Sequence, residues 1–400
     1  MPPALPPLPA RAVAPPAAVL ARVLAGVLGT MALLGIASTS RADPAPTEES
    51  LGELIARLGL HAAPAPVRDR PDWRAPRRIL LLGFEPSTRA ERDRLARAVP
   101  GAELAVARDV PEAVRLAGNV DVIVGFNPQI CDARIIDAAR QLRWIFSLAA
   151  GVEQCVSLPA VRARHLLITN MRGVDSAPIA EHAIALALAL AHGLDIYMAA
   201  TEQAHWRKAD AALAHPRMLA GKTLLVVGLG GIGADVARQA HGLGMRVIAT
   251  RESARPGPDF VSRVGGPDEL LDFARAADVI VMTAPLTEKT RGLFDARFFA
   301  VVKPTAIFIN VARGASVVTN DLVRALNEHH LGGAGLDVVD PEPLPPDHPL
   351  WRAPHVIVSP HVSSLSDIPS DARWRLTAEN LRRYAAGEPM LSVVDIERGY

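Results

Sequence analysis

Three polar side chains each follow an apolar stretch in the second half of the chain, beside a glycine or a proline. Arg313 precedes a glycine, Glu342 stands between two prolines, and His361 follows a Ser-Pro pair. An arginine offers a planar fork to a carboxylate and a carbonyl oxygen. A histidine transfers protons near neutral pH, and a carboxylate beside it orients the ring and favours its charged form. Together these types suit the protonation of an alkoxide formed from a 2-oxo acid, although singly they also fit a surface charge, a solvated loop and a structural histidine.

The elements that must position these side chains are organised around a glycine-rich turn. Residues 223–227 are apolar or β-branched and run into the G-x-G-x-x-G turn of Gly228, Gly230 and Gly233, and apolar residues then recur at helical spacing. Strand, tight turn and helix is the context that a dinucleotide site needs. The first glycine permits the turn, the second lets the backbone approach a pyrophosphate, and the third lets the helix pack on the strand. Since ligands collect at the carboxyl ends of strands in such sheets, the three polar side chains are expected to converge near a nicotinamide.

The composition of the chain excludes several classes of protein. Its 43 Lys and Arg residues balance 42 Asp and Glu residues, so no basic field indicates a nucleic-acid partner. Cys131 and Cys155 are too few for a disulfide framework and lack the spacing of a metal site, so they are interpreted as buried thiols. No metal ligand set is predicted.

Residues 1–42 have the order of charges and apolar residues that marks a secretory signal. Arg11 and Arg22 precede an uncharged run over 23–37, and small residues at positions 40 and 42 mark a cleavage site after Ala42. The run is short for a stable membrane span. We therefore expect a signal peptide and a periplasmic or secreted protein. The alternative is a mis-assigned start codon and a cytoplasmic protein.

The rest of the chain alternates strands and helices, which predicts an α/β protein with two doubly wound, parallel-sheet (Rossmann-like) domains and an active-site cleft between them. Residues 43–77 form a linker with one short helix over 51–58. A substrate domain covers 78–182 and is completed by 365–400, and a nucleotide-binding domain covers 183–364. Helices are expected over 133–142, 180–191 and 371–385, the second of them buried. Strands are expected at 79–82, 103–107, 120–124, 144–147, 167–169, 223–227, 245–250, 278–282, 305–310, 332–337 and 355–358.

From residue 78 onward the chain resembles the D-isomer-specific 2-hydroxyacid dehydrogenases, most closely over 221–364. The resemblance rests on the glycine turn, the L-T-x-x-T loop at 286–290, the I-N-V-A-R-G block at 309–314, and the G-L-D-V and P-H blocks at 335–338 and 360–361. It implies that Arg313 binds substrate, that Glu342 pairs with His361, and that His361 is the general acid and base.

The resemblance also implies contacts beyond these three residues. The S-L-A-A-G-V run at 147–152 is similar to the loop whose N–H groups meet the substrate carboxylate, so Ala150 and Gly151 are expected in the substrate site. Glu153 departs mildly from the aspartate that is usual next to that run. Members are typically homodimers, so the same is expected here. The resemblance implies cofactor contacts from Gly228, Gly230, Gly231, Ile232, Gly233, Thr250, Arg251, Ser253, Pro285, Leu286, Thr290, Val311, Ala312 and Asp337.

The residue after the second strand of the nucleotide unit predicts which cofactor is preferred. Arg251 stands at the interval from the glycine turn at which NAD-type members place an aspartate for the ribose hydroxyls. An arginine can instead pair with a 2′-phosphate, and Ser253 and Arg255 are close in sequence. NADP is therefore expected to be preferred, with NAD possible. The alternatives are that Arg251 stacks on adenine or that Glu252 serves the ribose.

The expected activity is reduction of a small 2-oxo acid, of the glyoxylate or hydroxypyruvate kind, to a D-2-hydroxy acid by NAD(P)H. No stable membrane span is expected. The rival interpretation is a non-catalytic nucleotide sensor or interaction protein on the same fold. The presence of Arg313, Glu342 and His361 together favours the enzyme.

Overall fold

Two parallel β-sheets organise the chain in the computed structural model. The structure describes residues 49–399 apart from 84, 85, 87, 207, 209–214, 254 and 367–369. The expected signal peptide therefore lies outside the described residues. Both sheets belong to a single unit that begins at Ser50.

The first sheet has five strands in the order β2-β1-β3-β4-β5, all parallel. Its strands are almost wholly apolar, as expected where helices cover both faces. The strands are β1 (Arg78–Leu82), β2 (Glu103–Ala107), β3 (Val122–Gly125), β4 (Trp144–Ser147) and β5 (Leu167–Thr169). The helices between and before them are α2 (Leu51–Arg57), α3 (Arg89–Ala98), α4 (Val110–Leu116), α5 (Ala133–Ala138), α6 (Glu153–Val156) and α7 (Pro159–Ala163).

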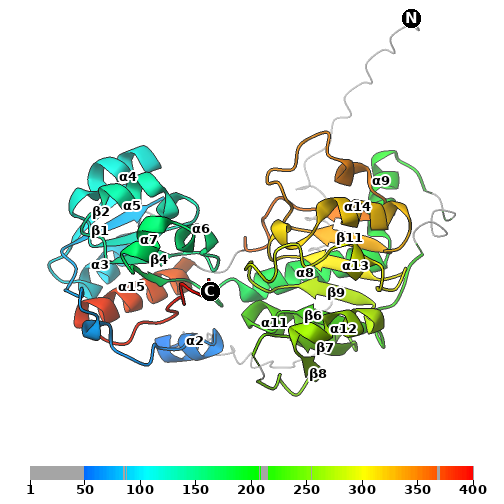
Figure 1. Ribbon diagram of the computed structural model, residues 1–400, viewed down its shortest axis with the longest axis horizontal. Coiled ribbons are helices and arrows are strands. Elements are labelled where there is room, and N and C mark those ends of the chain that lie inside the picture. Colours follow the sequence, from blue (N-terminus) through cyan, green and yellow to red (C-terminus); the bar gives the residue numbers. More distant parts are fainter. Residues whose placement is uncertain are drawn as a thin grey trace, which may run out of the picture. The chain divides into compact units, whose positions relative to one another are not determined.

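The last long helix, α15 (Ser370–Ala386), returns to this first sheet (red in Figure 1). Its Tyr384 ring stacks on Trp144 of β4 with 4.8 Å between the ring centroids. Trp73 donates to the carbonyl of Tyr384, which ties the segment before β1 to the same helix. One core therefore joins the beginning and the end of the described chain.

The second sheet has seven parallel strands in the order β12-β11-β10-β9-β6-β7-β8. Helices α8 and α11 pack on one face, and α12, α13 and α14 pack on the other. The strands are β6 (Thr223–Val227), β7 (Arg246–Thr250), β8 (Val261–Gly265), β9 (Val279–Met282), β10 (Ile307–Asn310), β11 (Gly333–Leu336) and β12 (Val356–Val358). The helices are α8 (Ser176–Ala191), α9 (Leu194–Glu202), α11 (Gly231–Gly242), α12 (Leu270–Ala276), α13 (Ala296–Phe299) and α14 (Thr319–Asn327).

The predicted fold class is confirmed, with two local errors. Strand β8 was not predicted, because Ser262 and Arg263 are exposed at the sheet edge and break the apolar run. The helix expected over 133–142 ends at Ala138. The Arg164 guanidinium instead donates to the carbonyls of four residues in that segment, so the helix need not continue to satisfy them. The domain boundaries at 182 and 364 remain predictions.

Helix α8 is buried, as its uniformly apolar sequence predicts. Nine of its residues are buried, and several belong to the core beneath the seven-stranded sheet. No single helix in the described part of the chain has the length and apolar composition to cross a membrane. Helices α8 and α9 meet that criterion only as a pair bent by 76°.

The two cysteines are buried, as expected, but the interpretation of them as thiols is wrong. Cys131 and Cys155 form a disulfide that closes 24 residues of chain. Sequence spacing carried no sign of it, because the two segments meet only when η3 (Gln129–Cys131) packs beside α6. The bond fixes the start of α6 against the loop that follows β3.

Candidate active site

The glycine turn after β6 is shaped for a phosphate. Gly228 has a φ of 102°, and its N–H donates to the carbonyl of Thr250 at 3.0 Å. A β-carbon at Gly233 would collide with the carbonyl of Gly228, whereas one at Gly230 would meet nothing within 4 Å. The turn is therefore packed beneath and open at its tip, where α11 begins and its free N–H groups face outward. These residues fit a dinucleotide pyrophosphate.

Arg313 lies three residues after β10, in a turn held by a buried amide. The Asn310 side chain is fully buried, accepts from the Ala312 N–H at 3.0 Å and donates to the Arg313 carbonyl at 2.9 Å. Ser316 donates to the same carbonyl at 2.7 Å. A β-carbon at Gly314 would overlap the backbone of Val339, so the glycine lets this turn pack against the loop after β11. The residues of the 309–314 block therefore form a fixed turn, which sets the direction in which the Arg313 side chain points.

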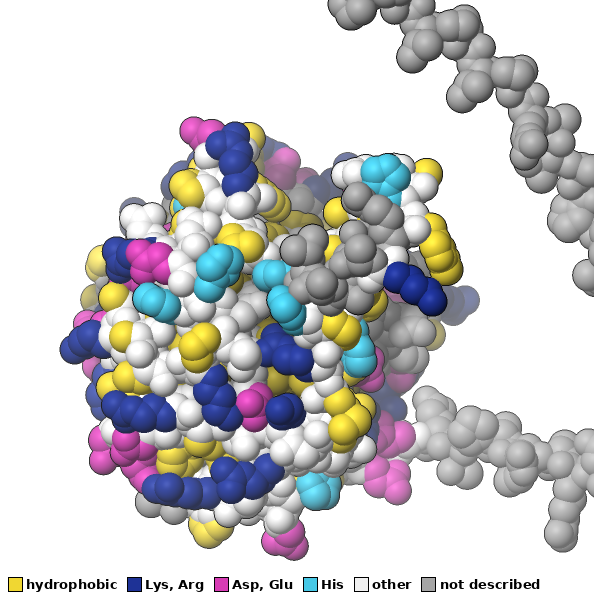
Figure 2. All heavy atoms as spheres, turned by 90° about the vertical axis from the view of Figure 1, so that its right-hand side faces the viewer, with side chains coloured by type: hydrophobic (Ala, Val, Ile, Leu, Met, Phe, Trp, Pro, Cys, Tyr) yellow, Lys and Arg dark blue, Asp and Glu magenta, His cyan; other side chains and the backbone are white. Residues whose placement is uncertain are grey.

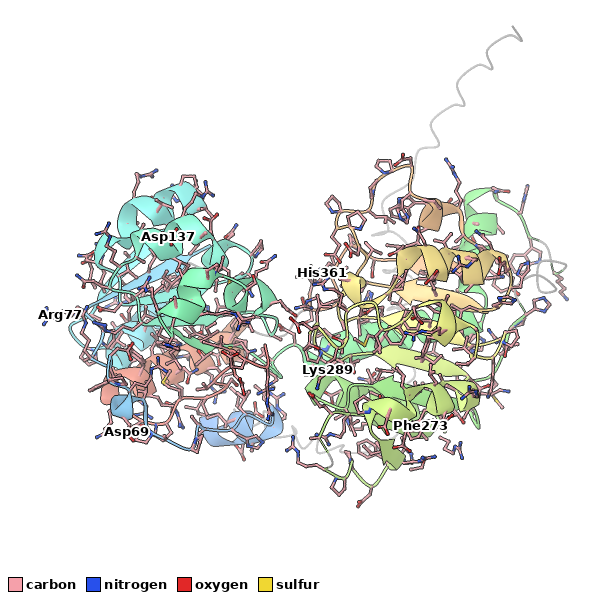
Figure 3. The ribbon with its side chains drawn as sticks, viewed as in Figure 1. Asp69, Arg77, Asp137, Phe273, Lys289 and His361 are labelled. Atoms are coloured by element: carbon pink, nitrogen blue, oxygen red, sulfur yellow. A yellow bond between two sulfur atoms is a disulfide. The ribbon has the colours of Figure 1, made fainter. Side chains whose placement is uncertain are left out.

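His361 and Glu342 form a hydrogen-bonded pair at the same edge of the sheet. The His361 Nδ1 lies 2.9 Å from Oε2 of Glu342, whose Oε1 accepts from the Val339 N–H at 3.0 Å. Figure 3 shows His361 at this edge, as it shows Lys289 from the loop after β9. The other ring nitrogen, Nε2, has no hydrogen-bond partner among the described residues. It is the atom that can exchange a proton with a substrate.

The carboxylate of Glu342 favours the protonated form of the His361 imidazole. The hydrogen bond to Glu342 raises the pKa of His361 above its usual value, against the opposing effects of burial and of the Arg313 charge. Burial by itself raises the pKa of Glu342, but the hydrogen bonds from His361 and the Val339 N–H outweigh it and lower that pKa overall. The arrangement therefore favours the charged form of His361, which is the form that can donate a proton.

Asp337, expected to contact the cofactor, accepts hydrogen bonds from the loop that carries His361. Its carboxylate accepts from the Ser359 hydroxyl at 2.7 Å and from the N–H groups of Val362 and Ser363 at 2.9 and 3.0 Å. Although burial opposes ionisation, these donors lower the pKa of Asp337. His361 has a φ of 55°, and its N–H donates to the Asp337 carbonyl at 2.8 Å. The aspartate thus positions the turn that carries His361, and its contact with a cofactor stays a prediction.

The loop after β4 is held by two amides from neighbouring segments. Asn170 donates to the Ala150 carbonyl at 2.6 Å, and Asn127 donates to the Gly151 carbonyl. Both carbonyls therefore accept hydrogen bonds from within the protein, which holds the loop in place. The Arg313 guanidinium lies against the α-carbon of Gly151, so closely that a β-carbon there would overlap it. The structure brings the expected substrate residues Gly151 and Arg313 together.

The residues after β7 place positive charge where an adenosine ribose would end. Arg251 makes long contacts, 3.5 and 3.4 Å, to the carbonyls of Arg255 and Pro256. Burial and the charge of Arg255 lower the pKa of Arg251. Glu252 is paired with Lys289 at 2.8 Å. Glu252, the alternative partner for the ribose, is therefore already paired with a lysine.

The remaining predicted cofactor residues lie around the carboxyl ends of the central strands. Thr290 donates to the Pro285 carbonyl at 2.7 Å and accepts from the Thr287 N–H, which closes the loop after β9 around Leu286. Val311 and Ala312 are buried beside the Arg313 turn. The side chain of Ile232 packs on the core under α11, and Gly231 lies against Ser176 of α8. Ser253 lies in the loop with Arg251.

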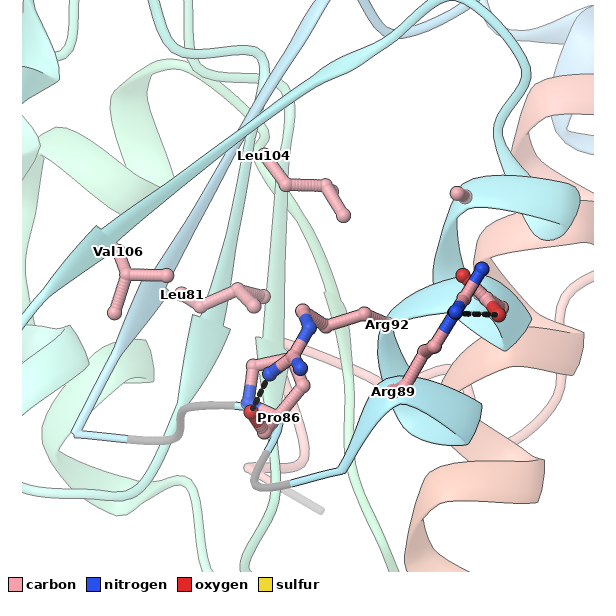
Figure 4. Close-up of a pocket in the computed structure, with 8 residues that line it drawn as sticks. Leu81, Pro86, Arg89, Arg92, Leu104 and Val106 are labelled. Atoms are coloured by element: carbon pink, nitrogen blue, oxygen red, sulfur yellow. Dashed lines mark hydrogen bonds and ion pairs between the residues drawn. The ribbon is translucent and has the colours of Figure 1, made fainter.

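Sequence reasoning missed three contributors to this site. Asn127 follows a strand of the first sheet, a position at which a polar residue could have been suspected. The ion pair of Glu153 with Arg313 and the disulfide at Cys155 depend on the tertiary fold and left no pattern. The site is also distinct from a cavity of about 530 Å³, which lies between α3 and β2 and is floored by Leu81, Leu104 and Val106 (Figure 4).

Comparison with known proteins identifies the family. Residues 184–363 match the family described as "D-isomer specific 2-hydroxyacid dehydrogenase, NAD binding domain". A glyoxylate reductase from Thermococcus kodakarensis is 32% identical over 303 residues, which are 72% of this chain and 88% of that protein. The chain belongs to the D-isomer-specific 2-hydroxyacid dehydrogenases.

Solved structures agree with this assignment. An NADPH-dependent glyoxylate/hydroxypyruvate reductase from Sinorhizobium meliloti, in complex with NADP and sulfate, is 29% identical with a TM-score of 0.68. The match covers 81% of this chain and 99% of that one. A family member from Xanthobacter autotrophicus, in complex with NADPH and MES, is also 29% identical, with a TM-score of 0.67 and coverage of 82% and 100%. The two-sheet architecture of this dehydrogenase is that of the family.

Proposed function

We propose that this dehydrogenase reduces a small 2-oxo acid to a D-2-hydroxy acid with a nicotinamide cofactor. The observation that carries the proposal is the His361–Glu342 pair beside Arg313, behind a nucleotide turn that is open at Gly230. When bound, the reduced nicotinamide supplies the hydride. Arg313 holds the carboxylate and carbonyl oxygen of the substrate, and Nε2 of His361 donates the proton to the oxygen that becomes the hydroxyl. Glu342 stabilises the protonated ring before that transfer.

Glyoxylate and hydroxypyruvate are the proposed substrates. The support is that relatives named glyoxylate reductase and glyoxylate/hydroxypyruvate reductase share about a third of their residues with this chain. The test is loss of the NADPH absorbance band with glyoxylate, hydroxypyruvate, pyruvate and larger 2-oxo acids. Reduction of none of them by protein that binds the cofactor would favour the sensor interpretation and overturn this one.

NADPH is the proposed reductant. Arg251 and Arg255 supply two positive charges near the end of β7, and Glu252 is occupied by Lys289. The structures from S. meliloti and X. autotrophicus were solved with NADP and NADPH. Fluorescence titration should give a lower Kd for NADPH than for NADH. Equal constants would place the 2′-phosphate away from Arg251.

The proposed location is the periplasm or the extracellular space. Two features support it independently: the signal-like order of residues 1–42 and the Cys131–Cys155 disulfide, a bond typical of oxidising compartments. N-terminal sequencing of protein from the native host should find a chain that begins near Asp43. A cytosolic protein with an intact Met1 would contradict the proposal.

The proposed assembly is a homodimer through the seven-stranded unit. Figure 2 shows a face on which exposed hydrophobic side chains lie among charged ones and histidines. Light scattering should give twice the mass of the chain, and Met198→Asp should give a monomer. A monomeric wild-type protein would contradict the proposal. The exposed large hydrophobic residues on α9 and on the segments that follow α9 and β11 are Leu194, Met198, Trp206, Met218 and Trp351.

A further inference from the structure

The carboxylate of Glu153 is bound to Arg313 in the manner of a substrate carboxylate. Glu153 is the first residue of α6, directly after the loop that carries Ala150 and Gly151. Its Oε1 lies 3.1 Å from Nε of Arg313, and its Oε2 accepts from Nη2 at 3.2 Å. This is the two-point geometry with which arginine recognises a free carboxylate. Both side chains are partly buried, with exposed fractions of 32% for Arg313 and 26% for Glu153.

The donors that Glu153 uses are the ones that a substrate needs. Nη1 of Arg313 already donates to the Ala312 carbonyl at 2.7 Å, and the turn itself is fixed by Asn310 and Ser316. Nε and Nη2 therefore remain for recognition, and both face Glu153. Arg313 does not need Glu153 to hold its backbone in place.

The ion pair of Arg313 and Glu153 also lies against Gly151, in the loop after β4 that is expected to bind the substrate carboxylate. A β-carbon built at Gly151 would overlap the Arg313 guanidinium and lie 2.8 Å from Oε2 of Glu153. A 2-oxo acid that used both the loop and Arg313 would bring a second carboxylate to this point. Like charges in one desolvated site repel, so the two carboxylates cannot share the fork without cost.

We propose that Glu153 is an internal competitor of the substrate and a determinant of specificity. In the free enzyme its carboxylate holds Nε and Nη2 of Arg313, and an entering oxo acid displaces it. The displaced carboxylate remains beside the substrate and disfavours oxo acids with a second carboxylate. The site therefore selects small monocarboxylic oxo acids at the cost of weaker binding. The proposal rests on the proposed function of Arg313 as the substrate-binding residue.

The test compares Glu153→Gln with the wild type in binding and in turnover. Oxamate, an unreactive monocarboxylate of the shape of a small 2-oxo acid, is titrated calorimetrically into each protein in the presence of NADP. Loss of one charge-assisted competitor should lower its Kd about ten-fold or more. The KM for glyoxylate should fall by a similar factor, with kcat changed less than about three-fold. The ratio of kcat/KM for 2-oxoglutarate to that for glyoxylate should rise.

A matched control separates this effect from a general change in charge. Asp137 is an exposed acid on α5 in the same five-stranded unit and has no contact with Arg313 among the described residues, so Asp137→Asn should leave oxamate binding and KM unchanged. Glu153→Asp, which retracts the carboxylate, should fall between Glu153→Gln and the wild type. Thermal melting checks that each variant is folded.

The outcomes distinguish this proposal from the proposed function. If Glu153→Gln raises KM and lowers kcat, Glu153 braces Arg313 and the proposal is wrong. If no oxo acid is reduced by the wild type, the proposed function fails, but the oxamate titration still decides the role of Glu153. Tighter oxamate binding by the variant supports competition, whereas equal or absent binding in both proteins overturns it.

Discussion

The two sheets contribute to the site in different ways. From the seven-stranded sheet, Arg313 and His361 each follow a strand by three residues and act through their side chains. From the five-stranded sheet, the loop over 149–152 presents backbone, and the amides of Asn127 and Asn170 hold its carbonyls. The seven-stranded sheet therefore supplies reactive side chains, and the five-stranded sheet supplies a backbone loop of fixed shape.

This difference follows from what each edge must do. Proton transfer and carboxylate recognition need particular side chains, which a short loop at a strand end can hold in one direction. Binding a small anion to N–H groups needs only a fixed backbone, which distant residues can brace. Single substitutions should therefore have large effects on turnover at the first edge and small ones at the second.

The largest effect is expected at the proton donor. His361→Asn should cut kcat by about two to four orders of magnitude, the usual contribution of a general acid. The Kd for NADPH should change little, because the turn is held by Asp337 rather than by the imidazole. The exposed His330→Asn serves as the control. Full turnover in the purified variant would remove His361 from the mechanism.

The next effect is expected at the carboxylate fork. Arg313→Ala should raise KM and lower kcat, with a combined loss in kcat/KM of about ten- to a hundred-fold or more, since one charge-assisted bond is worth about 1.5–3 kcal/mol. Arg313→Lys should recover only part, because an ammonium lacks the two-point geometry. Arg297, which is exposed on α13, provides a matched arginine-to-alanine control. Wild-type kinetics in the lysine variant would mean that Arg313 acts as a simple charge.

A single substitution in the seven-stranded unit should reduce the preference for NADPH over NADH. Arg251→Asp should lower the NADPH to NADH ratio of kcat/KM by about ten- to a hundred-fold, from the loss of one charge-assisted bond. Arg246→Asp, at the opposite end of the same strand, should leave the ratio unchanged. A wild-type ratio near one, unmoved by Arg251→Asp, would falsify the assignment of Arg251 to the 2′-phosphate.

The residues at the edge of the seven-stranded sheet could be predicted from the sequence, whereas the residues that hold the loop of the five-stranded sheet could not. Arg313, Glu342 and His361 could be predicted because parallel strands end at one edge and each residue type has a definite chemistry. Asn127, Glu153 and the disulfide could not, because their partners come from segments that only packing brings together. Strand β8 was missed for a local reason, since an exposed edge strand needs no continuous apolar run.

The pairing of Glu342 with His361 makes a prediction about pH. Because the hydrogen bond to Glu342 raises the pKa of His361, the acid stays protonated above the ordinary histidine pKa of about 6.5. The rate of reduction should be highest below that value and decline as pH rises through the raised pKa. Glu342→Gln removes the carboxylate, so the decline should move to lower pH, with a larger loss at pH 8 than at pH 6. A profile of kcat/KM that does not move would show that Glu342 is not the cause of the shift.

The smallest effect on catalysis is expected from the disulfide behind the substrate loop. Cys131 and Cys155 are buried and bond η3 to α6, but neither is a donor to substrate. The double variant Cys131→Ser, Cys155→Ser should therefore keep kcat within about three-fold and raise KM modestly, because the loop that starts α6 loses one of its braces. Stability should fall by roughly 3 kcal/mol, the usual contribution of a bond that closes a loop of this size, which calorimetry would record as a lower Tm. Dithiothreitol should lower the Tm of the wild type and leave the double variant unchanged. If removing the bond cut kcat as severely as His361→Asn, the five-stranded edge would take part in the chemistry directly, and the division between the two sheets would be wrong.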